Sequence, residues 1–249
     1  MKRDIRVVIP TRLDSTRLPN KPLLEAGNKT LLEWTYERAC SGFDKVTILT
    51  SDTEISDFCR KKGMDSFFTS KLFPTGTHRI ADYATTSRLA KEDWFVDWQV
   101  DEPLLDVSYV EEIAENCESD EINTLVAPIS EEQRQDPNIV KAAWSTRGDC
   151  YWFSRSPLSG SFGHIGVYAF SRTALRFFYA TKKQQSYYAF HEKLEQLNWI
   201  EMSTQFYISA NFVPEFPLSI NSEEDWDAFK KRIDGQTNRH LPENANSKL

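Results

Sequence analysis

The chain has 249 residues, of which 40% are hydrophobic and 27% charged, and its formal net charge is −7. This length fits one large α/β domain or two small ones, and the acidic balance argues against a general nucleic-acid binder. No apolar run approaches the roughly 18 residues of a membrane span, and the charged start does not resemble a signal peptide. We therefore expect a cytoplasmic protein, without a membrane span or a nucleic-acid partner. The four cysteines are widely spaced, which predicts reduced thiols without disulfides or a zinc site.

Apolar, β-branched runs alternate with amphipathic segments through the first half of the chain. The predicted strands lie at residues 6–9, 45–50, 65–69, 94–100 and 123–129, and the predicted helices at residues 30–40, 53–62, 78–89 and 107–117. Strands that alternate with helices pair in parallel, with helices on both faces of the sheet. The pattern therefore predicts a doubly wound, mostly parallel α/β sheet.

The pattern changes at residue 131, where shorter strand-like pieces begin. The predicted strands in this half lie at residues 139–144, 150–153, 164–170 and 205–212, and the predicted helices at residues 173–180, 187–200 and 222–233. We expect residues 131–165 to form a small β-rich insert that covers the site or contacts a partner subunit. One domain would then span residues 1–234, and the polar residues 235–249 predict a disordered tail.

The most informative stretch is VVIPTRLDSTRLPNKPLL at residues 7–24, where a buried strand ends in a basic loop. The loop contains Arg12, Ser15, Arg17 and Lys21, and two prolines stiffen its second half. One guanidinium group can donate two parallel hydrogen bonds to phosphate oxygens, and an ammonium group adds a compact positive charge. A solvated loop without a ligand is the alternative that composition alone leaves open. The fixed shape and the side-chain chemistry favour a phosphate site.

Asp101 follows the strand predicted at residues 94–100. Open α/β sheets bind their ligands at the carboxyl ends of the strands, and a carboxylate there suits Mg²⁺. The alternative is that Asp101-Glu102-Pro103 only forms a turn after a strand. The sequence thus offers Asp101 as a candidate metal ligand.

Taken together, these segments resemble the 3-deoxy-manno-octulosonate (Kdo) cytidylyltransferases, also called CMP-Kdo synthetases. The loop IPTRLDSTRLPNKPL is similar to the signature with which that family begins. Further similar segments follow in the same order, at residues 31–39, 50–52, 76–79, 99–103, 136–141, 151–155, 164–168 and 192–197. The resemblance spans residues 5–233, so it concerns most of the chain.

The resemblance implies a nucleotidyltransferase-type fold and the transfer of CMP from CTP to the anomeric hydroxyl of Kdo or a related sugar acid, with release of pyrophosphate. It implies a homodimer, Mg²⁺ as cofactor and a role in lipopolysaccharide or capsule polysaccharide biosynthesis. The matching positions assign catalysis to Lys21, Asp101 and Arg12, nucleotide binding to Arg12, Ser15, Arg17, Lys21 and Gln99, and sugar binding to Arg79, Arg155, His164, Tyr168, Glu195 and Gln196. They assign metal binding to Asp101, with a weak contribution from Asn221.

The sequence departs from the family pattern at several positions. Asn20 stands where the family loop has glycine, and Val100 replaces the glycine before the metal aspartate. Asn221 replaces a second metal-binding aspartate, His78 stands where glutamate is common, and the loop at residues 156–163 is short. These departures leave alternatives open: a nucleotidyltransferase for another sugar such as an acylneuraminate, or a catalytically degenerate nucleotide-binding protein. A metal-dependent glycosyltransferase fits less well, because the basic loop suits a free triphosphate.

Overall fold

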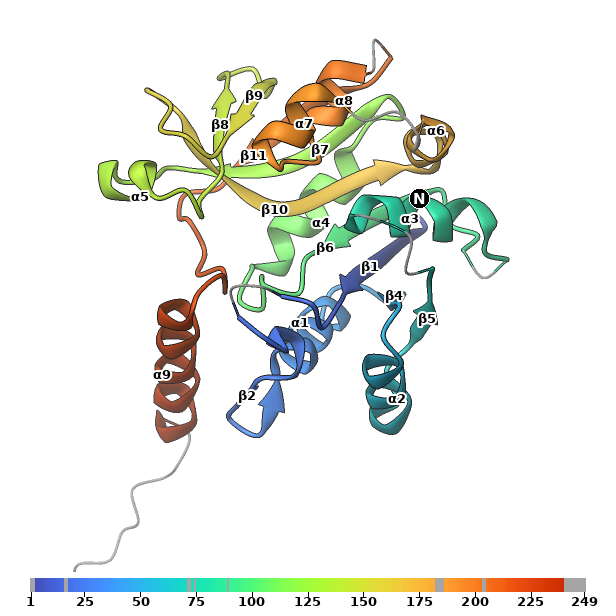
Figure 1. Ribbon diagram of the computed structural model, residues 1–249, viewed down its shortest axis with the longest axis vertical. Helices are drawn as coiled ribbons and strands as arrows, with labels where there is room; N and C mark the ends of the chain where they lie inside the picture. The colour runs from blue at the N-terminus through green and yellow to red at the C-terminus, as the bar shows by residue number, and fades with distance from the viewer. Residues whose placement is uncertain are drawn as a thin grey trace, which may run out of the picture.

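The structure is a computed structural model that describes residues 3–15, 18–70, 73, 75–88, 90–181, 186–202 and 205–239. Its main sheet has nine strands within these residues (Figure 1). They are β1 (Ile5–Thr11), β4 (Val46–Thr50), β5 (Ser66–Phe68), β6 (Trp94–Trp98), β7 (Glu121–Ala127), β8 (Lys141–Trp144), β9 (Cys150–Ser154), β10 (Phe162–Ser171) and β11 (Tyr207–Phe212). A separate two-stranded ribbon pairs β2 (Glu25–Ala26) with β3 (Lys29–Thr30).

The spatial order of the main path is β11-β7-β10-β6-β1-β4-β5. The pairs β1–β4, β1–β6, β4–β5 and β7–β11 are parallel, whereas β10 runs antiparallel to both β6 and β7. The predicted, mostly parallel sheet is therefore confirmed. The hairpin of β8 and β9 joins the first residues of β10.

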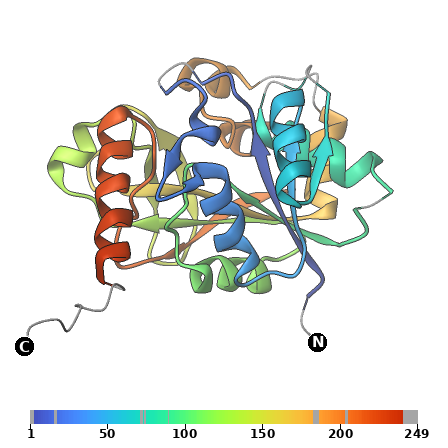
Figure 2. The same cartoon turned by 90° about the horizontal axis from the view of Figure 1, so that it is seen from below.

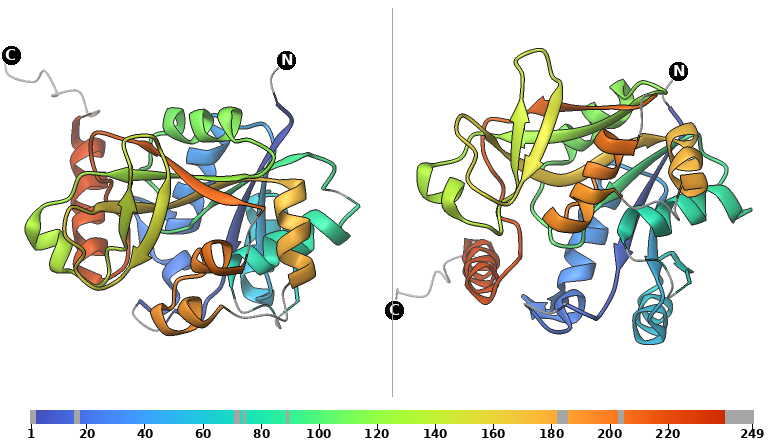
Figure 3. Two further views of the ribbon diagram at one scale, coloured as in Figure 1. Left: turned by 90° about the horizontal axis from the view of Figure 1, so that it is seen from above. Right: turned by 45° about the horizontal axis from the view of Figure 1, so that its top comes forward.

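Helices cover both faces of this sheet (Figures 1 and 3). The helices are α1 (Leu31–Cys40), α2 (Thr53–Lys62), α3 (Gly76–Thr86), α4 (Val107–Asn116), α5 (Glu131–Gln135), α6 (Arg172–Thr181), α7 (Tyr187–Glu192), α8 (Leu197–Met202) and α9 (Glu223–Arg239), with a short 3₁₀ helix η1 (Lys21–Leu23). Val7 and Ile9 of β1 pack with α1, α2 and α4, whereas Val8 packs with α3, α6, α7 and α8. This alternation follows from the two-residue period of a strand.

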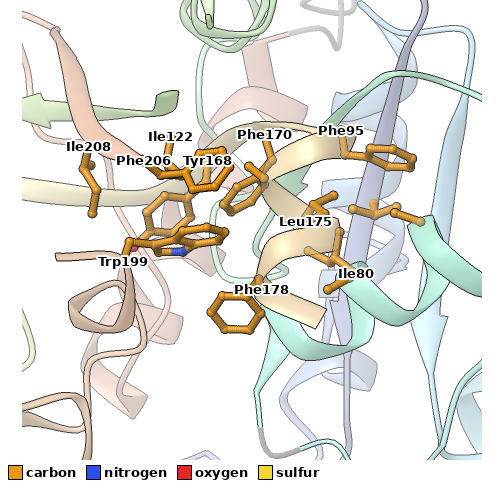
Figure 4. Close-up of a cluster of buried hydrophobic side chains, with 14 of the residues drawn as sticks. Ile80, Phe95, Ile122, Tyr168, Phe170, Leu175, Phe178, Trp199, Phe206 and Ile208 are labelled. Atoms are coloured by element: carbon orange, nitrogen blue, oxygen red, sulfur yellow. The ribbon is translucent and has the colours of Figure 1, made fainter. Parts of the chain in front are cut away.

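The second of these cores is rich in aromatic residues. Figure 4 shows Phe95, Tyr168 and Phe170 of the sheet beside Phe178 of α6 and Trp199 of α8. The Phe178 and Trp199 ring centroids are 4.9 Å apart. A fully buried side chain of this size contributes about 1.5–3 kcal/mol. This core supports α3 and α8, whose neighbouring loops line the site described below.

The last helix, α9, packs on the β2–β3 ribbon and the start of α1 (Figure 2). The Ser222 hydroxyl accepts from the amide of Asp225 at 3.2 Å, and the Asp225 carboxylate accepts from the amide of Ser222 at 2.9 Å. These two bonds form a reciprocal cap of the capping-box type at the start of α9. The predicted disorder from residue 235 is wrong for residues 235–239, because α9 continues to Arg239. Residues 240–249 lie outside the described residues.

The helix predicted at residues 187–200 is instead two short helices, α7 and α8. Lys193 ends α7 with a left-handed backbone, φ 56°, which interrupts the helical hydrogen bonds. Residues 131–135, within the predicted β-rich insert, form the short helix α5, capped by Ser130. None of the described helices is long and apolar enough to cross a membrane.

Candidate active site

A cavity of about 910 Å³ lies at the carboxyl ends of β1 and β6. Pro10, Thr11 and Arg12 line it from the end of β1, and Gln99 and Asp101 line it from the segment after β6. Further walls come from the start of α3, from β10, and from residues 136–140, 193–196 and 216–222. Its position and size suit a small-molecule site, since open α/β sheets bind ligands at this edge.

The basic loop contributes Arg12, which is exposed and lines the cavity. The amide of Leu13 donates to the Asp52 carboxylate at 2.9 Å, which fixes the start of the loop. Ser15 is half-buried and is not among the lining residues; its amide donates to the carbonyl of Leu13 at 2.8 Å. Arg17, predicted to bind phosphate, lies outside the described residues.

Lys21 is held at a junction of three distant segments. Its Nζ donates to Asp101 Oδ2 at 2.7 Å and to the carbonyl of Ile220 at 2.8 Å. The amide of Ile220 in turn donates to the carbonyl of Asp101 at 2.9 Å. Lys21 is therefore paired with the Asp101 carboxylate. Unlike Arg12, it is not among the residues that line the cavity. Asn20 takes a left-handed backbone, φ 54°, a conformation that asparagine tolerates well in place of glycine.

Asp101 and Asn221 line the same cavity, and the Ile220 hydrogen bond joins their segments. No group of three or more His, Cys, Asp or Glu side chains among the described residues could hold a metal ion. Asp101 and Asn221 together offer one carboxylate and one amide oxygen. Such an oxygen-only pair fits Mg²⁺, which takes few protein ligands and completes its shell with phosphate and water oxygens. Val100 does not enter the cavity, because its side chain packs in the core with α1 and α4.

Two buried carboxyl groups near this edge of the sheet were not among the site residues that the sequence predicted. Glu102 is 4% exposed and accepts from the Ser219 hydroxyl, while its Oε2 has no hydrogen-bond partner. Burial and the neighbouring Asp101 raise the pKa of Glu102 to about 8. Asp97 is fully buried, and its Oδ1 accepts from Gln99 Nε2 at 2.7 Å, which orients Gln99 at the cavity. Asp97 could have been noticed from the sequence, because it is a charged residue within a strand that the sequence predicts to be buried.

The six residues assigned to the sugar all line the cavity: Arg79, Arg155, His164, Tyr168, Glu195 and Gln196. The structure therefore brings together side chains from α3, β10, the end of β9 and the α7–α8 turn. Arg79 is 7% exposed and its Nη1 has no hydrogen-bond partner. Burial lowers the pKa of Arg79, and its charge interacts with those of Asp52 and Arg12, which places it toward the basic loop.

Glu195 carries a carboxyl group that lines the cavity beside the start of α3. Burial raises its pKa, although hydroxyl groups of Thr75 and Thr77 donate to it. Its Oε2 has no hydrogen-bond partner. A buried oxygen without a partner is unfavourable, so a ligand hydroxyl or ammonium group would satisfy it.

His164 is enclosed by the rings of Phe153 and Tyr168, with centroids at 5.1 Å and 5.2 Å. Its Nε2 lies 3.1 Å from the Thr124 hydroxyl, which donates to the carbonyl of Val167 at 2.5 Å. The Nε2 nitrogen is then the donor of this pair, and in the neutral ring Nδ1 is left as the acceptor. Burial lowers the pKa of His164 to about 3.

We expect the ring resonances of His164 to stay constant between about pH 8 and pH 5, where an ordinary histidine titrates. The native pKa of about 3 lies below the unfolded value of 6.5, so the stability that depends on neutral His164 is complete above 6.5 and declines as the pH falls toward 3. NMR titration of the assigned His164 signals measures this directly. A midpoint near the ordinary value would contradict the buried, neutral ring.

Comparisons with known proteins agree with this geometry. A family model described as cytidylyltransferase matches residues 6–209. The 3-deoxy-manno-octulosonate cytidylyltransferase of Acidobacterium capsulatum is 32% identical over 239 residues, which cover 91% of this chain and 95% of that protein. The enzyme of the same name from Nitratidesulfovibrio vulgaris is 33% identical over 210 residues, covering 78% of this chain and 82% of that protein.

The fold comparison gives the same result. The structure of a CMP:2-keto-3-deoxy-manno-octonic acid synthetase complexed with CTP superposes with a TM-score of 0.81 and 25% sequence identity. The superposition covers 93% of this chain and 99% of that one. The family model and the relatives above 30% identity extend over most of the chain. The chain belongs to the cytidylyltransferase family.

Proposed function

We propose that this protein transfers CMP from CTP to the anomeric hydroxyl of Kdo or a related 3-deoxy-2-ulosonic acid and releases pyrophosphate. The observation that carries the proposal is the single cavity that Arg12, Asp101 and the sugar-side residues share. It is large enough for a nucleotide and a sugar acid to lie side by side. The names of the relatives and the CTP complex of the similar structure support the same substrates.

The nucleotide lies against the loop after β1. Arg12 presents its guanidinium group to the triphosphate, where paired N–H donors match phosphate oxygens. Arg79, assigned above to the sugar, is proposed to contact the triphosphate instead, because its charge interacts with that of Arg12. Gln99, held by Asp97, lies at the floor and faces the nucleoside. Lys21, fixed beside Asp101, adds positive charge where the pyrophosphate leaves. Preorganised charges of this kind stabilise the transition state without reorganisation during the reaction.

The sugar acid occupies the other end of the cavity. Arg155 binds its carboxylate, and Tyr168, Glu195 and Gln196 bind its hydroxyl groups. This arrangement directs the anomeric hydroxyl at the α-phosphate, and positioning of that kind accounts for much of the rate in phosphoryl transfer. A bound Mg²⁺, held by Asp101 and Asn221, would supply positive charge beside the α-phosphate.

We further propose that the protein acts in the cytoplasm as a homodimer, in lipopolysaccharide or capsule polysaccharide biosynthesis. Exposed aromatic side chains support an association surface: Tyr187 and Phe190 of α7 are 64% and 61% exposed. Apolar side chains gathered on a surface mark contact sites more often than single exposed ones do. The cytoplasmic proposal is supported by the four free cysteines.

A nucleotide panel and a sugar-acid panel test the proposal. CTP with Mg²⁺ should stabilise the fold more than ATP, GTP or UTP does. At a CTP concentration one hundred times the dissociation constant for CTP, the free energy of unfolding should rise by about 2.7 kcal/mol. Pyrophosphate release should require both CTP and a 3-deoxy-2-ulosonic acid. Faster pyrophosphate release with an acylneuraminate than with Kdo would show that the substrate belongs to that other class of sugar acids. CTP binding without any release would favour a catalytically degenerate protein.

A further inference from the structure

Lys141 is a buried cation that the proposed chemistry does not use. It begins β8, and its exposed fraction is 0%. Its Nζ donates to three backbone carbonyl oxygens: Asp136 at 2.8 Å, Ile139 at 2.7 Å and Arg155 at 2.5 Å. An ammonium group has three N–H donors, so every donor of Lys141 is satisfied. Burial lowers the pKa of Lys141, and the negative charges of Asp136 and Glu192 oppose that shift.

The three carbonyls belong to two segments of the cavity wall. Asp136 and Ile139 lie in the turn that precedes β8, and Arg155 directly follows β9. Asn138, Ile139, Val140 and Arg155 all line the cavity. A second contact joins the same segments, because Arg155 Nη1 donates to the carbonyl of Pro137 at 3.1 Å. One ammonium group therefore fixes both segments relative to each other.

The β-ladder does not need this ammonium group. Lys141 pairs with Gly163 of β10 and with Ser154 of β9 through the backbone. The amide of His164 also donates to the carbonyl of Val140 at 2.8 Å. The strands are thus held by their own hydrogen bonds. The Lys141 side chain instead fixes the positions of the turn before β8 and of Arg155, both of which lie at the cavity.

We propose that Lys141 is a positioning residue that fixes Arg155 and residues 136–140 as one rigid wall and thereby sets the affinity for the sugar acid. The inference rests on the proposed function, since it takes Arg155 as the carboxylate-binding residue. Lys141 itself contacts only backbone carbonyls and makes no contact with the substrate. Its effect should appear in sugar-acid binding and leave nucleotide binding intact.

Arg172 provides a matched control at the far end of the sheet. Its guanidinium group also holds three backbone carbonyls, those of Ala84, Ala90 and Glu92. It begins α6, and its amide donates to the carbonyl of Asp93, just before β6 starts, whereas the cavity lies beyond the end of β6. Arg172→Met therefore removes the same kind of contact without touching the cavity wall.

The experiment compares Lys141→Met and Arg172→Met with the wild type. We expect Lys141→Met to raise KM for the sugar acid roughly tenfold or more, because a displaced binding group weakens positioning, while Kd for CTP changes less than about twofold. Arg172→Met should lower Tm and leave both constants unchanged. If Lys141→Met does not fold, Lys141→Gln, which keeps two N–H donors, should show the same split in weaker form.

Amide hydrogen exchange gives a readout that needs no turnover. The amides of residues 136, 138–140 and 155 should exchange faster in Lys141→Met than in the wild type, and at the wild-type rate in Arg172→Met. Equal exchange in all three proteins, or a parallel loss of CTP and sugar-acid binding, would overturn the role of Lys141. Failure of the wild type to turn over any ulosonic acid would instead count against the proposed function, and the exchange rates would still decide on Lys141.

Discussion

Replacing Asp101 by asparagine should lower kcat by about a hundredfold to a thousandfold, the range expected when one preorganised electrostatic group is removed. Asp101 is the carboxylate that bonds Lys21 at 2.7 Å and lines the cavity beside Asn221. Asparagine keeps the shape but removes the negative charge, so both Mg²⁺ and Lys21 lose their anionic partner. Kd for CTP without metal should change little, because the arginines of the phosphate site remain. Steady-state kinetics and CTP calorimetry measure the two effects separately.

Asp106→Asn is the matched control for this substitution. Asp106 caps α4, where its carboxylate accepts from the amide of Ser108 at 2.9 Å, and it does not line the cavity. Asparagine caps a helix about as well as aspartate, so stability and kcat should stay near wild type. A value of kcat for Asp101→Asn within tenfold of wild type would show that Asp101 does not hold the metal.

Replacing Glu92 by glutamine should lower the free energy of unfolding by about 3–5 kcal/mol, the cost of removing one member of a buried ion pair. Glu92 is 2% exposed and accepts from Arg6 Nε and Nη2, each at 2.9 Å. Lys45 Nζ lies 2.9 Å from the same carboxylate. Glutamine preserves the volume but removes the counter-ion that Arg6 contacts at 2.9 Å, which leaves Arg6 with the Asp65 carboxylate at 3.6 Å. Chemical denaturation measures the loss, and KM should not change, because Glu92 lies at the opposite end of the sheet.

The same residue makes stability depend on pH. Burial alone would raise the pKa of Glu92, but the hydrogen bonds from Arg6 and Lys45 lower it to about 2, from an ordinary value of 4.5. The stabilisation is therefore complete above pH 4.5 and is lost as the pH falls toward 2. Glu92→Gln should lack this part of the acid transition. The exposed residue Glu54 offers the control, since Glu54→Gln should change stability by no more than about 0.5 kcal/mol.

The strand–helix order was predictable because each element has a local signal. The β-branched run at residues 45–50 and the amphipathic stripe at residues 30–40 became β4 and α1. The helix predicted at residues 187–200 failed for a local reason, since Lys193 takes a left-handed backbone that lysine rarely adopts. That turn is important, because it places Glu195 and Gln196 at the cavity.

Residue types and the family resemblance predicted which residues belong to the site, but they did not predict which of those residues contact one another. The prediction that Lys21 binds the triphosphate did not include its contacts with Asp101, 80 residues away, and with Ile220, 199 residues away. No local pattern encodes contacts at such separations. The same holds for Glu102, whose missing hydrogen-bond partner depends on how tightly Ser219 and its neighbours enclose it.

Direct identification of the product tests the central claim. The protein is incubated with CTP, Mg²⁺ and Kdo, and the mixture is analysed by mass spectrometry and ³¹P NMR. The account predicts a CMP–sugar phosphodiester formed in equal amount to pyrophosphate, and its loss in Asp101→Asn. Pyrophosphate without the phosphodiester, or no reaction with Kdo or any other ulosonic acid, would contradict it.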